Sequence, residues 1–383
     1  MKKRVFLILK EDIIYYPPVL SLIRILRKLD YRVYHIGVYT DKKQKEYLES
    51  QGVTFLQTLQ YKGNANPFIK LLQQWKFRRQ VNSFLKRLSP TETDYVWLIQ
   101  AETVCLLNSL IFKYKTIVHL FEYVEPHINF KYRLLNPTFK MSVAMREAYK
   151  VICCEYNRSQ ITKGLFQLKE LPIVLPNKFY LDEKELENPP TDVMDIVNDI
   201  HTKIEGKKVI LYQGSFLEKD RRLEEFCQAI DDCPDDYVLL AMGPNVGMYR
   251  YLKGRYSSNK IIFLPFIRPP FHLLVTKLAS IGVLSYFPKS KNVASVINPL
   301  YCAPNKIFEY SRYGIPMVSN DVPGLYYIYM EYKCGECISY PLTPDGIKKA
   351  ILKIFDNYEM YSQGAYNYYN SINIANIINK ILT

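Results

Sequence analysis

Residues 300–324 read LYCAPNKIFEYSRYGIPMVSNDVPG, and this stretch predicts a short helix followed by a buried strand. Pro304 suits the first helical turn, where a missing N–H costs little. Gly314 suits the left-handed residue beyond the helix end, and the proline two residues later prevents the helix from continuing. The apolar strand begins at Met317. We expect residues 322–324 to form a turn that leads the chain away from this strand.

One face of this helix carries polar side chains. Asn305, Lys306 and Glu309 share it, because residues three and four apart are neighbours on a helix. One interpretation is a solvated face with a Lys306–Glu309 ion pair worth about 0.2–0.5 kcal/mol. The other is an anion site, in which the helix N-terminus and Lys306 supply positive charge and the carboxylate accepts hydrogen bonds from sugar hydroxyls. Taken alone, these residues favour the solvated face.

Positive charge is concentrated in the first half of the chain. Residues 1–185 contain 30 Lys and Arg against 17 Asp and Glu, whereas residues 186–383 contain 21 against 20. A basic half attracts anionic partners such as membrane lipid, nucleic acid or a phosphorylated substrate. The eight cysteines are dispersed along the chain, which favours reduced thiols in a cytosol over a disulfide framework.

The N-terminal sequence resembles the start of a signal peptide. Its apolar part, residues 5–9, ends at Lys10 and is shorter than the about 7–15 residues of such a segment. We therefore expect a buried first strand. No apolar run approaches the about 18 residues that a membrane-spanning helix needs.

Strand-like and helix-like segments alternate in both halves of the chain, which is typical of parallel α/β sheets. The sequence therefore predicts two Rossmann-like α/β domains facing each other across a cleft. We place the first domain at 1–185, a polar linker at 186–206 and the second domain at 207–360. The expected strands are 4–9, 32–38, 53–56, 95–99, 116–120, 151–154, 209–213, 237–242, 261–264, 281–284 and 316–319.

Residues 67–88 predict a long helix in which six basic residues accompany Phe68 and Trp75. Basic residues beside aromatic ones can mark a surface that binds at a membrane interface. In the alternative, the apolar stripe of the helix faces the sheet and the basic residues face water. The sequence leaves both interpretations open.

Two residues of the second half have the chemistry of a phosphate site. Gly214 follows the strand expected at 209–213 and, without a side chain, lets the backbone approach a ligand closely. Arg221 lies near the start of the next helix, and with Lys306 it would clamp a diphosphate, since guanidinium matches pairs of phosphate oxygens.

Several motifs are absent. No Gly-x-x-x-x-Gly-Lys-Ser/Thr loop and no Gly-x-Gly-x-x-Gly after the first strand are found, which argues against nucleotide hydrolases and dehydrogenases. No Asp-x-Asp pair is present to hold a divalent metal, and the five scattered histidines lack zinc-site spacing.

Three stretches together resemble the GT-B glycosyltransferases of the retaining family 4 (GT4) type, which is found in bacterial surface-polysaccharide synthesis. They are Tyr212-Gln213-Gly214 with Arg221, Ala303-Pro304-Asn305-Lys306-Ile307-Phe308-Glu309-Tyr310 with Gly314-Ile315-Pro316, and Glu155-Tyr156-Asn157-Arg158 followed by Leu175-Pro176-Asn177. The resemblance covers nearly the whole chain and is strongest over 209–324. It implies a two-domain enzyme that uses a nucleotide-diphosphate sugar.

The resemblance also implies roles for residues of the donor site. Glu309 would accept hydrogen bonds from the ribose hydroxyls of the donor, and Asn305 would lie beside it. Arg221 and Lys306 would neutralise the diphosphate leaving group, so no metal and no cofactor is expected. Gly214 would let its loop approach the donor.

On the acceptor side, the resemblance implies that His119 and Glu122 face a glycan or polyprenyl-linked acceptor. It also implies that residues 361–383 form a last helix that crosses back to the first domain. The enzyme would be cytoplasmic, with its basic domain against the anionic inner face of the membrane. Nucleic-acid binding is disfavoured, because no recognition motif accompanies the positive charge.

The sequence departs from the family pattern at Tyr301, where the family's Glu-x7-Glu motif has its first Glu. Its first β–α loop, residues 10–18, also lacks the glycines common in the family. Two other functions therefore stay open: a sugar-nucleotide epimerase, and a subunit that binds a nucleotide sugar without turnover.

Overall fold

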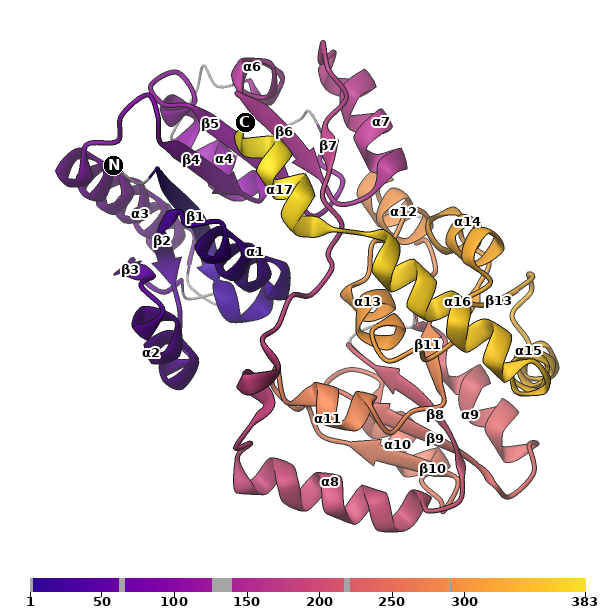
Figure 1. Cartoon of the computed structure of the whole chain (residues 1–383). Coiled ribbons are helices and arrows are strands. Elements are labelled where there is room, and N and C mark those ends of the chain that lie inside the picture. The colour runs from indigo at the N-terminus through magenta and orange to yellow at the C-terminus, as the bar shows by residue number, and fades with distance from the viewer. Residues whose placement is uncertain (1–2, 62–65, 126–139, 217–220, 290) are drawn as a thin grey trace. The chain divides into compact units, whose positions relative to one another are not determined.

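The computed structural model describes residues 3–61, 66–125, 140–216, 221–289 and 291–383. The chain forms two compact units, which are labelled by element in Figure 1. The first unit comprises Met1–Tyr180 together with Ile374–Thr383, and the second comprises Leu181–Asn373.

The described part of the first unit contains a seven-stranded parallel sheet. The buried first strand that we expected after the basic N-terminus is confirmed, because residues 5–9 are fully buried in β1. In sheet order the strands are β3 (Thr54–Gln57), β2 (Arg32–Val38), β1 (Arg4–Asp12), β4 (Tyr95–Ile99), β5 (Thr116–Leu120), β6 (Lys150–Cys153) and β7 (Ile173–Val174).

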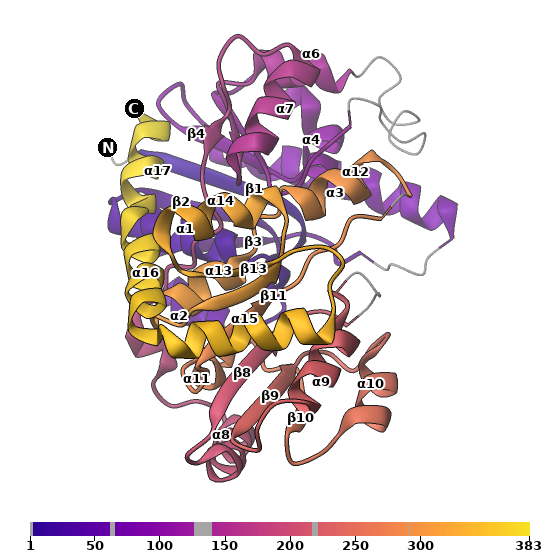
Figure 2. The same cartoon turned by 90° about the vertical axis from the view of Figure 1, so that its right-hand side faces the viewer.

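Helices cover both faces of this sheet. Figures 1 and 2 show α1 and α17 on one face and α3 and α4 on the other. The helical elements are η1 (Ile13–Tyr15), α1 (Pro17–Lys28), α2 (Lys42–Ser50), α3 (Pro67–Leu88), α4 (Ala101–Leu107), η2 (Asn108–Leu110), α6 (Met141–Glu147), α7 (Tyr156–Phe166) and α17 (Ile374–Leu382).

The second unit contains a six-stranded parallel sheet within its described residues. In sheet order the strands are β10 (Ile261–Leu264), β9 (Tyr237–Met242), β8 (Lys208–Gln213), β11 (Ile281–Leu284), β12 (Met317–Asn320) and β13 (Gly335–Ile338). The helical elements are η3 (Glu183–Leu186), α8 (Thr191–Ile204), α9 (Leu223–Asp231), α10 (Tyr249–Tyr256), α11 (His272–Thr276), α12 (Val293–Leu300), α13 (Asn305–Ser311), α14 (Pro323–Tyr332), α15 (Pro344–Asp356) and α16 (Tyr358–Ser371).

Alternate residues of the central strands of this second sheet enter two different cores, because successive side chains of a strand point to opposite faces. Val209 and Leu211 of β8 pack with residues of α8, α13 and α14. Ile210 and Tyr212 pack with residues of α9, α10 and α15. Both faces are therefore dry, as the continuous apolar strands of a parallel sheet require.

The helix and strand predicted for residues 300–324 are confirmed as α13 and the buried β12. The helix begins one residue later than expected, because Pro304 is its N-cap, and Gly314 has the predicted positive φ of 64°. The turn expected at 322–324 is wrong. Pro323 instead opens α14, since the fixed φ of proline also suits the first position of a helix.

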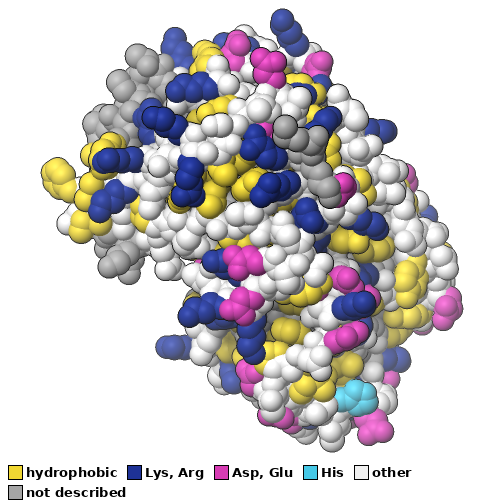
Figure 3. Space-filling view, turned by 60° about the vertical axis from the view of Figure 1, so that its left-hand side comes forward, with side chains coloured by type: hydrophobic (Ala, Val, Ile, Leu, Met, Phe, Trp, Pro, Cys, Tyr) yellow, Lys and Arg dark blue, Asp and Glu magenta, His cyan; other side chains and the backbone are white. Residues whose placement is uncertain are grey.

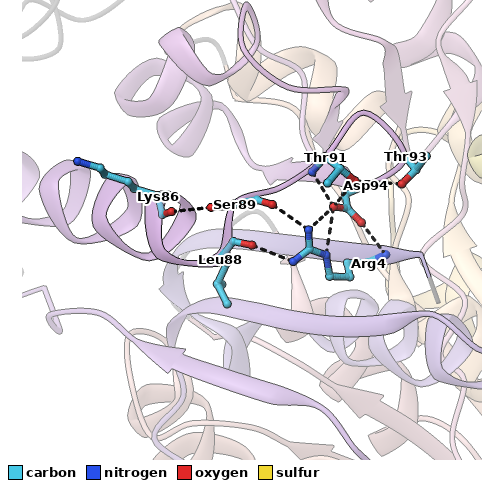
Figure 4. Close-up of polar contacts among 7 residues, drawn as sticks. All are labelled: Arg4, Lys86, Leu88, Ser89, Thr91, Thr93 and Asp94. Atoms are coloured by element: carbon cyan, nitrogen blue, oxygen red, sulfur yellow. Dashed lines mark hydrogen bonds and ion pairs between the residues drawn. The ribbon is translucent and has the colours of Figure 1, made fainter. Parts of the chain in front are cut away.

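A polar network ties the C-terminal end of α3 to the start of β1 (Figure 4). The Arg4 guanidinium donates to the carbonyl oxygens of Leu88 and Ser89 at 2.8 and 2.9 Å, and to Oδ2 of Asp94 at 2.6 and 3.1 Å. Asp94 also accepts from the backbone and the hydroxyl of Thr91. The carbonyl of Leu88, the last residue of α3, has no partner within the helix and is satisfied in this way.

No helix among the described ranges is both long enough and apolar enough to cross a membrane. The same residues contain no group of three or more His, Cys, Asp and Glu side chains placed to hold a metal ion.

Candidate active site

A buried carboxylate lies at the centre of the site in the second unit. Glu309 on α13 is 6% exposed, so the interpretation of a solvated helix face is wrong for this residue. Its Oε2 accepts a hydrogen bond of 2.6 Å from Nε2 of Gln213, and its Oε1 lies 3.3 Å from Nε2 of His272. Thr276 Oγ1 in turn donates to Oε1 of Gln213 at 2.8 Å. These contacts hold the Glu309 carboxylate in one orientation.

The surroundings of Glu309 favour its ionised form. Burial by itself raises the pKa of the carboxyl, because a charge is costly away from water. The neighbouring His272, the positive charge of Lys306 and the hydrogen bond from Gln213 outweigh burial, so the pKa of Glu309 lies below its ordinary value. An ionised carboxylate accepts hydrogen bonds only, and it is a suitable partner for hydroxyl groups.

Gly214 and Lys306 lie against each other. Gly214 has φ 153°, and a Cβ at this position would lie 2.8 Å from both Cε and Nζ of Lys306. The backbone conformation therefore favours glycine, and a larger residue here would also displace the end of the Lys306 side chain.

Lys306 is a half-buried cation, and within the described residues it forms no hydrogen bond or ion pair. Burial, followed by the positive charge of Arg221, lowers the pKa of Lys306 to about 8. Two cations that disfavour each other in this way would both be stabilised by an anion placed between or beside them.

Arg221 is held in place by residues that follow β11. Its guanidinium lies 4.4 Å from the ring centre of Tyr286 and donates to the Ser285 carbonyl at 3.4 Å. The Ser285 hydroxyl donates to the Arg221 carbonyl at 2.6 Å. Arg221 also lines a pocket of about 250 Å³ together with Phe216 and Met248.

The topology of the sheet explains why these residues meet. Gln213 is the last residue of β8 and Gly214 follows it, and Ser285 and Tyr286 follow β11. These two strands are adjacent in the sheet but far apart in the chain, so their carboxyl ends form a topological switch point. Ligands of open α/β sheets bind at such points.

The structure thus brings together Gly214, Arg221, Lys306 and Glu309. Lys306 and Glu309 lie on α13, and Asn305 is the first residue of that helix. This helix has only seven residues, so the positive charge at the site comes mainly from the side chains of Lys306 and Arg221. Sequence reasoning missed the residues that hold Glu309, which are Gln213, His272 and Thr276. In the sequence, only the position of Gln213 directly before Gly214 pointed to any of these three residues.

The two residues expected on the acceptor side belong to the first unit. His119 lies in β5, is 2% exposed and contacts the rings of Trp97 and Phe121. Burial lowers the pKa of His119 to about 3, and neither ring nitrogen has a hydrogen-bond partner among the described residues. Glu122 is exposed. Of these two residues, only Glu122 has an exposed side chain.

No protein-family description matches the sequence, and a search of curated proteins finds no match. Solved structures do match over the full length. HepE of Anabaena in complex with UDP-glucose is 14% identical, with a TM-score of 0.66, over 99% of this chain and 98% of that chain. A glycosyltransferase from Rickettsia africae is 12% identical, with a TM-score of 0.65, over 100% and 96% of the two chains.

WaaG, a glycosyltransferase involved in lipopolysaccharide biosynthesis, is 13% identical, with a TM-score of 0.59, over 99% of this chain and 98% of that chain. Identities this low show a shared fold. Together with the two parallel sheets, these likenesses confirm the fold predicted from the sequence, which is GT-B with two Rossmann-like α/β domains.

Proposed function

We propose that this protein transfers a sugar from a nucleotide-diphosphate sugar to a glycan or polyprenyl-linked acceptor. The observation that carries the proposal is Lys306, a half-buried cation beside Arg221 and Gly214, with no ion pair in the described residues. A diphosphate would supply the missing negative charge. The UDP-glucose held by HepE, a structure of the same fold, supports this class of ligand.

The chemistry follows from where charge develops. The bond between the sugar and the diphosphate breaks, and its electron pair stays on the diphosphate oxygen. Lys306 and Arg221 stabilise this charge without moving, which is how fixed cations lower a barrier. The acceptor hydroxyl forms the new bond on the face of the sugar from which the diphosphate departs, and its proton passes to the departing phosphate oxygen. The configuration at the anomeric carbon is therefore retained, and no metal is used. Glu309 and Asn305 orient the ribose hydroxyls.

The first unit would supply the acceptor side. Glu122 is accessible there, and we place it near the acceptor, with buried His119 behind it. The excess of Lys and Arg in residues 1–185 attracts anionic lipid, where a polyprenyl-linked acceptor is available. The enzyme would then be a cytoplasmic GT4-type transferase, peripheral on the inner membrane face, in polysaccharide biosynthesis.

Tyr301 supports a second candidate, a subunit that binds a nucleotide sugar without turnover. It follows α12 directly, at the position where the resembled family has a carboxylate. Nucleotide binding with no transfer to any acceptor would favour this candidate. Consumption of the donor with no acceptor present would instead indicate an epimerase.

Thermal unfolding in the presence of nucleotide sugars tests the proposal, because a ligand that binds only the folded state stabilises it. We expect a nucleoside diphosphate to raise the melting temperature more than its nucleoside does. Glu309→Ala should weaken binding by about tenfold or more, since hydrogen bonds to a charged group are each worth about 1.5–3 kcal/mol. Glu331→Ala, at an exposed position of α14, is the matched control.

Lys306→Met separates the diphosphate from the nucleoside. It should reduce the difference between nucleoside diphosphate and nucleoside, with Arg221 supplying what remains, while leaving the nucleoside's own effect unchanged. Transfer of a labelled sugar should be lost in both Glu309→Ala and Lys306→Met. Near-normal transfer by either variant would refute the assignment of the donor site.

A further inference from the structure

Helix α3 carries apolar side chains on two opposite faces. At 3.6 residues per turn, Phe68, Leu72 and Trp75 form one stripe, and Phe77, Val81 and Leu85 form another on the other side. The second stripe is buried against the sheet of the first unit. The sequence-based alternatives assumed one apolar stripe, and the structure shows that a second one is left over.

This outer stripe is exposed to solvent. The exposed fractions are 84% for Phe68, 48% for Leu72 and 46% for Trp75, and neighbouring Ile69 is 43% exposed. Surface helices normally present polar residues on this side. Contiguous exposed apolar side chains of this size mark an interaction surface.

The helix that carries the stripe is strongly basic. Its 22 residues include Lys70, Lys76, Arg78, Arg79, Lys86 and Arg87, with no Asp or Glu. The Arg79 guanidinium lies 5.4 Å from the ring centre of Trp75, so a cation borders the stripe directly. At the left edge of Figure 3, hydrophobic side chains project beside Lys and Arg side chains, with few acidic ones around them.

The exposed end of α3 is well formed. Asn66 caps its first turn by accepting from the Ile69 N–H at 2.9 Å, and Pro67 occupies the first helical position. The buried stripe and the contacts from Arg4 hold the other end against the sheet. The outer stripe is therefore presented on a rigid helix.

The charge of α3 decides what kind of partner fits. A second copy of the same helix would bring like charges together, which is unfavourable in an interface. An anionic bilayer fits both the apolar stripe and the positive charge. Trp and Phe favour the interfacial region of a bilayer, and the apolar stems of Lys and Arg let their charged ends reach the lipid phosphates. A basic helix with an aromatic stripe has the composition of helices that lie in the membrane surface.

We propose that Phe68, Leu72 and Trp75 insert into the headgroup region of an anionic lipid bilayer, while the basic residues of α3 contact the lipid phosphates. This assigns the membrane contact of the proposed function to one helix. The biological purpose of this contact rests on the proposed function, but the contact itself does not, because binding to vesicles is measured separately from binding of nucleotide.

Flotation of the full-length chain with phosphatidylcholine vesicles, with and without phosphatidylglycerol, tests the assignment. The full chain should bind the anionic vesicles at low salt and be released at high salt. The triple variant Phe68→Ser/Leu72→Ser/Trp75→Ser should bind on the order of tenfold or more weakly. The matched control is Phe112→Ser/Tyr156→Ser/Leu165→Ser, which removes side chains of similar exposure elsewhere in the first unit and should bind like the wild type.

The contribution of charge has its own pair of variants. Lys76→Gln/Arg79→Gln should weaken vesicle binding about 30-fold, from about fivefold per basic residue near the surface. Lys42→Gln/Lys43→Gln removes two exposed charges from α2 and should change binding little. Equal losses in both variants would mean that only net charge matters, which contradicts a docking surface on α3.

Tryptophan fluorescence reports insertion directly. Trp75 is exposed and Trp97 is fully buried, so quenching by brominated lipids should come from Trp75 alone and disappear in Trp75→Phe. Three outcomes would overturn the assignment: no binding to anionic vesicles at low salt, equal binding by the triple variant, or binding of single-stranded RNA with the same dependence on the stripe. Retained nucleotide binding by the triple variant would show that such a failure concerns the membrane surface and not the donor site.

Discussion

At the scale of single residues, Lys306 shows how position changes chemistry. A lysine on a solvated helix stays protonated far above neutral pH. Burial and the charge of Arg221 instead lower the pKa of Lys306 to about 8, next to a glycine that leaves room for its side chain. Its charge is therefore sensitive to pH in an accessible range.

We predict that affinity for a nucleoside diphosphate decreases as the pH rises from about 8 to 10. Below about 8 the Lys306 ammonium is protonated and pairs with the diphosphate, and above it the free protein loses this charge. The loss should approach about tenfold per pH unit, because one proton is then taken up with the ligand. Isothermal titration calorimetry across this range measures the effect.

Lys306→Arg is the control for this prediction. A guanidinium stays protonated throughout the range, so affinity in this variant should be independent of pH between about 8 and 10. A wild-type profile without any decrease above pH 8 would contradict the role assigned to Lys306.

At the scale of elements, the network around Asp94 fastens α3 to the first sheet. Asp94 is 3% exposed and forms an ion pair with Arg4. The Arg4 guanidinium also donates hydrogen bonds to the carbonyls of Leu88 and Ser89 at the C-terminal end of α3. Burial alone would raise the pKa of Asp94, but hydrogen bonds from Arg4 and Thr91 hold it below its ordinary value. The anchor of α3 is therefore stronger when Asp94 is ionised.

We predict that the free energy of unfolding falls as the pH drops below about 4, the ordinary pKa of an aspartate. The unfolded chain binds a proton at Asp94 before the native state does, so the stability contributed by this group is present above that pH and lost below it. Asp94→Asn should destabilise the protein by about 1–3 kcal/mol at neutral pH. On acidification its free energy of unfolding should fall by less than that of the wild type. Urea unfolding at several pH values measures both effects.

Glu170→Gln provides the comparison. Glu170 pairs with Lys150 but is 79% exposed, so its removal should change stability by less than about 0.5 kcal/mol at any pH. An equally steep loss of stability on acidification in the wild type and in Asp94→Asn would assign the effect to other carboxylates.

At the scale of the whole molecule, the chain leaves the first unit after Tyr180 and re-enters it at Ile374. The returning helix α17 buries Ile374, Ile378, Ile381 and Leu382, and the Leu382 carbonyl accepts a hydrogen bond from the buried Tyr95 hydroxyl. The fold of the first unit therefore depends on the last residues of the sequence.

We predict that Ile378→Ala destabilises the first unit by about 2–5 kcal/mol and leaves the second unit unchanged, because a buried isoleucine leaves a cavity. Hydrogen exchange measured peptide by peptide separates the two units. Lys380→Ala, at an exposed position of the same helix, should leave exchange in both units as in the wild type. Faster exchange throughout the second unit in Ile378→Ala would contradict the prediction that the loss of stability is confined to the first unit.

Much of the architecture could be predicted from local patterns. Runs such as residues 5–9 are apolar throughout, and a parallel strand buried on both faces requires this. Pro304 and Gly314 mark the limits of α13 through backbone constraints that act within a few residues. The same kind of signal was ambiguous at Pro323, where a turn and a helix start use the same φ.

The residues that position Glu309 could not be predicted. Gln213 is 96 residues from Glu309 in the chain, and Thr276 is 63 residues from Gln213, so no local pattern connects them. They meet because β8 and β11 are neighbours at the switch point of the sheet. Sheet order is a property of the folded chain.

The sequence alone therefore determined the α/β alternation, the limits of α13 and the unequal distribution of charge, because each depends on residue type over short distances. Only the tertiary structure decided that Glu309 is buried beside His272, that Lys306 lies against Gly214 with Arg221 nearby, and that one apolar stripe of α3 stays exposed. Burial and proximity depend on which elements pack together, and they change the pKa and the accessibility of residues whose chemistry is already known.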